Sequence, residues 1–506
     1  MCKIVYLKLR PIRSYPDKGR MDKLVKEAIE KEATLATRRH FLQSLGTGIG
    51  SLAFGSALWN CSSPLKNQQA STRIPPHFAK AKSVIFLHMA GAPSQLELFD
   101  YKPILAKFDG KECPKELLDG KKFAFIRGVP NLLGPKANFL QHGNAGHWIS
   151  DHMPHLATQA DKVTFLKGMY TDQFNHAPAQ LLMHTGSARL GRPSLGSWVS
   201  YGLGSENENL PSFMVLASGG KNPDAGKSAW GSGFLPSVYQ GVQCRSEGEP
   251  VLFIKNPEGV NTDIRKASID AINAVNEETF AEFGDPETVA RIAQYEMAYK
   301  MQSSVPDVMD ISKEPEYIHQ LYGTNPGKES FANNCLLARK MVEKGVRFVQ
   351  LFDWGWDAHG TGKNESVDFG LHQKCLQTDR AVSALLIDLE QRGLLDETLV
   401  VWGGEFGRTP MQENREGKKQ SFFGRDHHTE AFTMWLAGGG IKPGMSFGET
   451  DDLGYATVSG KTSIYDLQAT ILHCLGINHE EFTFPFQGRN FRLTDVYGKV
   501  IKPILA

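Results

Sequence analysis

Residues 398–410 read T-L-V-V-W-G-G-E-F-G-R-T-P, and this stretch carries the clearest signal for the fold. Residues 399–402 form a short apolar run with adjacent β-branched side chains, which is typical of a strand buried on both faces of a parallel sheet. The run breaks at Gly403 and Gly404, and Glu405 is the first charged residue beyond it. Because ligands in open α/β sheets bind beyond the carboxyl ends of the strands, we expect Glu405 to lie at a functional edge.

Similar apolar runs occur on both sides of this stretch. Further strands are predicted at residues 83–89, 163–166, 212–216, 346–352 and 433–437. Helices are predicted at residues 153–160, 334–344 and 371–392, after Asp285-Pro286, and after the capping sequence that starts at Ser463. Strands that alternate with helices predict an α/β fold, with a mostly parallel central sheet and helices on both faces. We assign this domain to residues 79–506, with a helical insertion at about 217–330.

Side chains that commonly bind metals follow the predicted strands. Asp357 and His359 come after the strand at 346–352, Glu405 comes after the strand at 399–402, and the segment G-R-D-H-H supplies Asp426, His427 and His428. Imidazole and carboxylate groups are typical ligands of zinc, iron and manganese. We therefore predict that these six residues bind a divalent metal, with zinc favoured. Taken singly, each has a structural alternative, such as a loop cap, a buried core histidine or a solvated ion pair.

Two arginines and a further histidine complete the predicted site. Arg408 and Arg425 are candidates to hold an anionic group, because a guanidinium can pair bidentately with phosphate or sulfate. His176 lies at the start of a predicted helix, whose dipole favours an anion. It is a candidate nucleophile, or a general acid that assists a metal-activated water, and a helix cap is its structural alternative. His88 and His184 lack comparable spacing and are treated as background.

An export signal is predicted near the N-terminus. The sequence T-R-R-H-F-L at residues 37–42 precedes a moderately apolar, glycine-rich run that ends near Leu58. Paired arginines before such a run are typical of signals read by the twin-arginine translocase. We therefore assign residues 37–58 to this signal and 59–78 to a linker, and expect a periplasmic or extracellular protein. The apolar run is too short and too rich in glycine for a stable membrane span.

Two alternatives concern this region. Residues 1–36 form an extended segment ahead of the signal, and Met21 is an alternative start that would give a more usual length. Cys61 follows the apolar run, but residues 58–61 read L-W-N-C, which is a poor lipoprotein sequence. A lipid anchor is therefore the less favoured alternative.

The composition excludes some classes of function. The chain has 506 residues, with 56 lysines and arginines against 55 aspartates and glutamates. This balance, without a long basic block, gives no support to nucleic-acid binding. The seven cysteines are widely scattered, so no disulfide framework is predicted, although one pair is compatible with an oxidising compartment.

Several motifs together resemble those of the domain of unknown function 1501 family. They are T-R-R-H-F-L, V-I-F-L-H-M-A-G-A-P-S, F-N-H-A-P-A, W-D-A-H-G, G-G-E-F-G-R-T-P, G-R-D-H-H and F-Q-G-R-N-F-R-L-T-D. That family comprises bacterial proteins exported by the twin-arginine pathway and grouped with the alkaline phosphatase and sulfatase superfamily. The resemblance extends from about residue 83 to the C-terminus and implies an alkaline-phosphatase-like fold. It also implies that Glu405, Asp357, His359 and either His427 or His428 are metal ligands.

The chain departs from sulfatases at the nucleophile. Sulfatases carry C-x-P-S-R or S-x-P-S-R, whereas residues 176–180 here read H-A-P-A-Q. The aspartate that relatives place at the end of the first strand is also missing, since Met89-Ala90-Gly91 stands there. These differences argue against a formylglycine sulfatase.

We therefore expect an exported, metal-dependent hydrolase-like protein that acts on phosphate or sulfate esters of an anionic small molecule or polysaccharide. The alternative is a non-catalytic extracellular binding protein on the same fold. The missing nucleophile and first-strand aspartate favour the binding protein, whereas the joint presence of Glu405, Asp357 and His359 favours the hydrolase.

Overall fold

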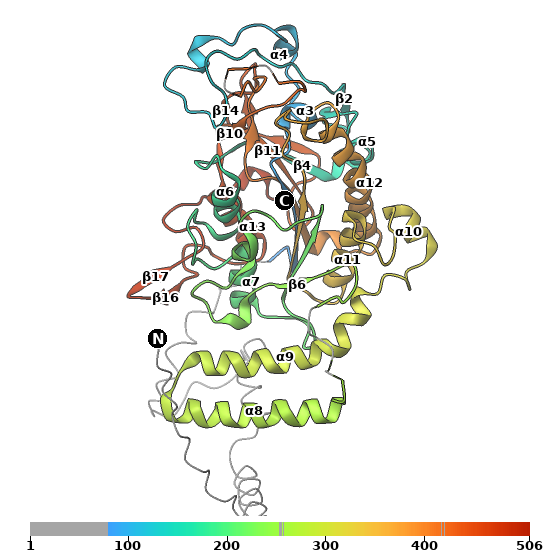
Figure 1. Cartoon of the computed structure of the whole chain (residues 1–506), viewed down its shortest axis with the longest axis vertical. Helices are drawn as coiled ribbons and strands as arrows, with labels where there is room; N and C mark the ends of the chain where they lie inside the picture. The colour runs from blue at the N-terminus through green and yellow to red at the C-terminus, as the bar shows by residue number, and fades with distance from the viewer. Residues whose placement is uncertain (1–78, 252–255, 257, 416, 419) are drawn as a thin grey trace, which may run out of the picture. The chain divides into compact units, whose positions relative to one another are not determined.

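The computed structural model describes residues 79–506 except 252–255, 257, 416 and 419 (Figure 1). The predicted export signal, the segment before it, the linker and Cys61 all lie outside the described residues. Within the described part, every helix is too short or too polar to cross a lipid bilayer.

A central sheet of nine strands organises the fold. Its strands follow the order β12-β4-β11-β8-β1-β7-β5-β6, and β15 also pairs with β4. Their bounds are β1 Ser83–Ala90, β4 Val163–Tyr170, β5 Phe213–Ser218, β6 Val242–Cys244, β7 Phe348–Trp354, β8 Thr398–Gly403, β11 Phe432–Ala437, β12 Met445–Phe447 and β15 Thr462–Ser463. All six predicted strands are present in it, including the strand at 399–402, which forms the core of β8.

Most neighbouring strands run parallel. β1 lies between β8 and β7 and is parallel to both, while β5 is parallel to β7 and β6. β11 is the exception, since it is antiparallel to both β8 and β4. The predicted class, an α/β fold with a mostly parallel central sheet, is confirmed.

Helices cover both faces of the sheet (Figure 1). Ile85, Leu87 and Met89 of β1 belong to a core shared with α5 Pro154–Ala157, α10 Glu316–Tyr322, α11 Phe331–Glu343 and α12 Gly370–Gln391. Val84 and Phe86 belong to a second core, shared with α6 His176–Thr185, α7 Leu195–Leu203 and α13 Ile464–Cys474. This division follows from the strand geometry, because successive side chains point to opposite faces.

Two long helices, α8 Thr262–Phe283 and α9 Pro286–Met309, pack against each other. The Asp285 side chain accepts a hydrogen bond from Glu287 N at the start of α9, and Pro286 occupies its first turn. The predicted capping box of α13 is also present, between Ser463 and Asp466. The start of α8 was not predicted, although Asn261 caps it in the same way.

Shorter elements join these layers. They are α3 Gln95–Leu98, α4 Pro103–Lys107, β2 Phe139–His142, β3 His147–Ser150, β9 Gly407–Arg408, β10 His427–His428, β13 Glu449–Thr450, β14 Thr457–Ser459, β16 Phe484–Phe486 and β17 Arg489–Phe491. The five described cysteines are buried and unpaired: Cys113, Cys244, Cys335, Cys375 and Cys474.

Candidate metal centre

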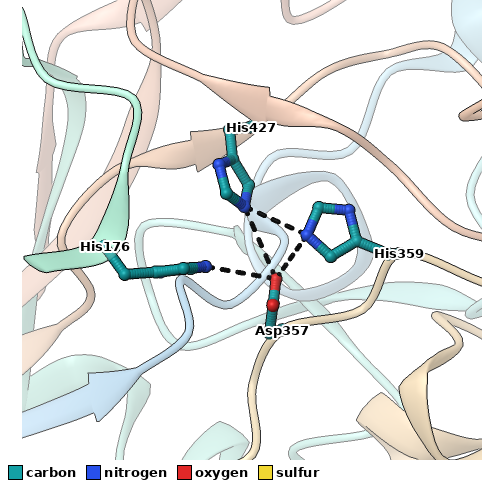
Figure 2. Close-up of side chains that lie close together, drawn as sticks. All are labelled: His176, Asp357, His359 and His427. Carbon is teal, nitrogen blue, oxygen red and sulfur yellow. Dashed lines mark hydrogen bonds and ion pairs between the residues drawn. The ribbon is translucent and has the colours of Figure 1, made fainter. Parts of the chain in front are cut away.

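Three imidazoles and one carboxylate converge at the carboxyl edge of the sheet. They belong to His176, Asp357, His359 and His427, here called the four-residue cluster, and one donor atom from each lies within 4.8 Å of the others. The Asp357 Oδ1 atom lies 2.8 Å from His359 Nε2, 3.4 Å from His176 Nε2 and 3.6 Å from His427 Nε2. Figure 2 shows the three imidazoles directed at this oxygen.

The strand topology explains why these residues meet. His176 opens α6 shortly after β4, and Asp357 and His359 follow the end of β7. His427 lies in β10, which pairs with β9 in the loop after β8 and places His427 opposite Arg408. The cluster therefore draws on three loops at one edge of the sheet, the position expected for a ligand site in an α/β fold.

Two glycines allow these loops to approach closely. Gly91, after β1, has a φ of +111°, and a Cβ atom there would lie 2.6 Å from the backbone nitrogen of Asp357. A Cβ atom on Gly424 would lie 1.9 Å from the carbonyl carbon of His359. Any larger residue at either position would displace a backbone segment that carries a member of the cluster.

Each imidazole of the cluster is held by a bond from its outer nitrogen. His176 Nδ1 lies 2.6 Å from Glu405 Oε1, His427 Nδ1 lies 2.6 Å from the carbonyl oxygen of Phe174, and His359 Nδ1 bonds Glu413. Since carboxylate and carbonyl oxygens only accept, they place the ring proton on Nδ1 and turn Nε2 toward the centre. Metal-binding histidines commonly have such outer partners.

The structure places Glu405 behind His176 rather than in the cluster. Its side chain is completely buried, and it accepts hydrogen bonds from Gly91 N at 3.1 Å, Gln180 Nε2 at 3.1 Å and His176 Nδ1 at 2.6 Å. His88 Nε2 lies 3.2 Å from its other oxygen. Burial alone would raise the pKa of Glu405, but the two histidines hold it well below its usual value.

The two predicted anion-binding arginines are occupied by protein groups. Arg408 is fully buried and donates to the carbonyl oxygens of Gly91, Ala92 and Arg425 and, at 2.5 Å, to Asp357 Oδ1. Arg425 is also fully buried and donates to Glu97 and to the carbonyl oxygens of Thr409 and Gly134. With these partners, neither guanidinium faces solvent, so the anion-holding role expected for them is not supported by their surroundings.

The structure does not bring Asp426 and His428 into the cluster. The Asp426 carboxylate accepts from the backbone nitrogens of Phe125, Ile126 and His427. It also lies in a second buried group with His359 and Glu413. His428 Nε2 bonds the carbonyl oxygen of Tyr455, and its pKa is lowered by burial. Of the nine predicted site residues, the four of the cluster meet, and Glu405 and Arg408 support two of them directly.

The pKa values reflect the crowding of these groups. Burial would raise the pKa of Asp357, but Arg408 and the three imidazoles hold it well below its usual value. Burial would lower the pKa of His176, but the Asp357 and Glu405 carboxylates raise it to about 9. Burial and neighbouring positive groups lower the pKa of His427 to about 4. His427 is therefore neutral near pH 7 and presents a lone pair to the centre.

The donor set fits a zinc ion. Three imidazole nitrogens and one carboxylate oxygen match the ligand types and the number of ligands that zinc takes in proteins. The buried His176 Nε2 atom has no hydrogen-bond partner, and His359 Nε2 lies 3.1 Å from His427 Nε2. Without a cation, the raised pKa of His176 keeps a proton on its Nε2 atom near pH 7, and a bound cation would displace that proton. The cluster is also reachable, because 28% of the Asp357 side chain and 14% of the His176 side chain are exposed.

Two supporting residues were not predicted as part of the site. Glu413 bonds His359 and lies in the same loop as Glu405, three residues beyond Pro410. His88 lies within the apolar run of β1 and contacts both Glu405 and, at 3.2 Å, His184. A polar residue inside an apolar strand was the available signal, because a buried polar group needs a partner.

The sequence matches a known family over most of its length. A profile of the family described as protein of unknown function (DUF1501) matches residues 81–505. No curated protein matches the sequence.

Three solved structures are similar to this one. A sulfatase from Pseudoalteromonas sp. is 12% identical, with a TM-score of 0.35 over 83% of this chain and 71% of that chain. A phosphonate monoester hydrolase from Silicibacter pomeroyi is 12% identical, with a TM-score of 0.33 over 84% and 76%. An alkaline phosphatase from the Antarctic bacterium TAB5, with magnesium bound, is 12% identical, with a TM-score of 0.33 over 79% and 99%. Similarity this distant assigns no activity to the chain.

Proposed function

The chain belongs to the DUF1501 family of proteins of unknown function, and from the geometry of the four-residue cluster we propose that it is an exported, metal-dependent hydrolase-like protein. The proposed substrates are phosphate or sulfate esters of an anionic small molecule or polysaccharide. The observation that carries the proposal is the convergence of three imidazoles and a carboxylate whose outer atoms are already fixed by other groups.

Each residue of the site has a defined task in this proposal. We reassign His176 from the nucleophile or general acid expected from the sequence to the ligand set, so that His176, Asp357, His359 and His427 would hold the metal, with zinc favoured by the donor set. When bound, zinc would supply Lewis-acid polarisation of a phosphoryl or sulfuryl oxygen, which would have to join the four side chains as a fifth ligand. Glu405 and Glu413 keep the Nδ1 protons of His176 and His359 directed outward, so that both Nε2 atoms stay available.

Arg408 has a supporting task. Its guanidinium holds Asp357 Oδ1, the oxygen at the centre of the cluster. An ion pair of this kind fixes the direction of the carboxylate and keeps it ionised, as a metal ligand requires. We therefore reassign Arg408 from the substrate to the ligand set, and leave Arg425, which pairs with Glu97, to the stability of the surrounding loops.

Export belongs to the same proposal. We propose that residues 37–58 direct the protein through the twin-arginine translocase, and that the chain acts in the periplasm or outside the cell. The rival function is a non-catalytic binding protein that uses the same edge of the sheet. The hydrolase and the binding protein differ in whether the metal-loaded protein hydrolyses an ester.

The test uses protein exported by its own signal and purified without chelators. Metal content measured by mass spectrometry should be about one zinc ion per chain, as expected for a site of four ligands. The preparation should hydrolyse 4-nitrophenyl phosphate or 4-nitrophenyl sulfate. His359→Asn should lose both metal and activity, whereas His319→Asn, in α10 and bonded to Thr324, should lose neither. A metal-loaded protein without esterase activity would favour the binding protein.

A further inference from the structure

The burial of Arg408 and Arg425 leaves neither of the two predicted guanidinium groups free for an anionic substrate. Both side chains are 0% exposed and bonded to protein oxygens. A substrate that carries negative charge beyond the ester itself would need other cations within reach of the cluster. Two such cations lie over aromatic rings that touch the cluster imidazoles.

The first cation is Lys221. Its Nζ atom lies 3.3 Å from the centroid of the Trp354 ring, and half of its side chain is exposed, at 50%. The Trp354 ring in turn meets the edge of His176, with 6.4 Å between the ring centroids. The carboxylate of Asp224 lies 3.6 Å from the ammonium group and is itself partly exposed, so water screens that pair.

The second cation is Arg415. Its guanidinium carbon lies 4.0 Å from the centroid of the Phe125 ring, and 36% of its side chain is exposed. The Phe125 ring meets the edge of His359, at 4.9 Å between centroids, and of His427, at 5.7 Å. Arg415 bonds Glu413 through its Nε atom at 2.5 Å.

These two pairs lie on different sides of the metal site. Trp354 contacts His176, whereas Phe125 contacts His359 and His427. Figure 2 shows His176 and His359 on opposite sides of Asp357. A cation held over an aromatic face keeps its charge at low entropic cost, because the ring restricts the side chain before any ligand arrives.

We propose that Lys221 and Arg415 hold anionic groups on either side of the ester that is cleaved, so that the substrate is a polyanion spanning the four-residue cluster. This inference rests on the proposed function, since it assigns the substrate class of the same site. The shared chemistry is a chain with repeated sulfate or phosphate groups. A substrate with a single anionic group would occupy the metal and use neither cation.

The test measures binding of the zinc-loaded protein to dextran sulfate and to inorganic polyphosphate by titration calorimetry, with neutral dextran as the uncharged probe. Lys221→Met and Arg415→Met should each weaken binding about two- to five-fold, the usual effect of one exposed charge. Lys221→Arg should restore the affinity because it keeps the charge. Arg489→Met is the matched control: Arg489 also lies over a ring, that of Phe491, but in the β16–β17 hairpin.

Hydrolysis of 4-nitrophenyl esters separates this inference from the proposed function. These single-anion esters should react with an unchanged KM in Lys221→Met, while dextran sulfate or polyphosphate should inhibit this variant more weakly than the wild type. Arg415→Met is compared by polymer binding alone, because Arg415 also bonds Glu413, the partner of His359. Preference for one of the two polymers identifies sulfate or phosphate. Wild-type polymer affinity in both variants, or equal binding of neutral dextran, overturns the inference. Polymer binding that weakens in both variants, without any ester hydrolysis, would support polyanion binding by Lys221 and Arg415 and refute the hydrolase.

Discussion

Replacing Glu405 by glutamine tests whether this residue orients His176. The substitution keeps the size of the side chain but exchanges one oxygen for an NH₂ group. Glu405 is completely buried; one of its oxygens accepts from Gly91 N, His176 Nδ1 and Gln180 Nε2, and the other lies 3.2 Å from His88 Nε2. In glutamine, one of these two oxygens becomes an NH₂ group, which cannot accept a hydrogen bond. The neighbours of that oxygen therefore lose their acceptor.

The expected losses follow from these contacts. Hydrogen bonds to charged groups contribute about 1.5–3 kcal/mol each, so the metal-free protein should lose about that amount of unfolding free energy. Mutation of a residue that bonds the outer nitrogen of a metal-binding histidine typically weakens metal binding by about 10- to 100-fold, or about 1.4–2.7 kcal/mol. The zinc affinity of Glu405→Gln should therefore fall within that range, without complete loss of the site.

Competition with a coloured zinc chelator would measure the affinity, and urea denaturation with EDTA present would measure the metal-free stability. The matched control is Glu390→Gln on α12, where an exposed glutamate pairs with Lys162 and neither quantity should change. Unaltered zinc affinity in Glu405→Gln would refute the orienting role. A loss far above 100-fold would show that Glu405 coordinates the metal itself, as its place in the sequence predicts.

Three further predictions concern separate features. Arg408→Met should lower the unfolding free energy by about 3–5 kcal/mol and weaken zinc binding, because it leaves Asp357 without its buried partner; wild-type zinc affinity would argue against this. Burial raises the pKa of Asp379 to about 6, above its ordinary 3.8. The protonated carboxyl is therefore favoured in the folded state, and its contribution of about 3 kcal/mol is fully present below about pH 4 and is lost as pH rises through 6. Denaturation between pH 4 and 7 should show this loss of unfolding free energy in the wild type and not in Asp379→Asn. Arg38→Lys with Arg39→Lys should retain the precursor in the cytoplasm, as cell fractionation would show, and undiminished export would refute the signal assignment.

The hydrophobic pattern of the sequence determined the fold class and the edge at which the site lies. Uniformly apolar runs such as residues 399–402 specify strands buried on both faces, since water must be excluded from each. Parallel strands end at a common edge, which is why the sequence alone predicted that residues after β7 and β8 lie close together. Local signals also sufficed for helix ends: Asp285 caps α9 and Ser463 caps α13 through bonds within three residues.

Only the tertiary structure decided which of the polar residues face the centre. Glu405 and His176 are 229 positions apart, and their bond makes the histidine a member of the cluster and the glutamate its support. Arg408 likewise turned inward to Asp357 rather than outward to solvent. In loops, side-chain direction depends on backbone angles and on contacts between distant segments, such as those at Gly91 and Gly424. The local sequence pattern does not predict those contacts, because they form only when the strands assemble into the sheet.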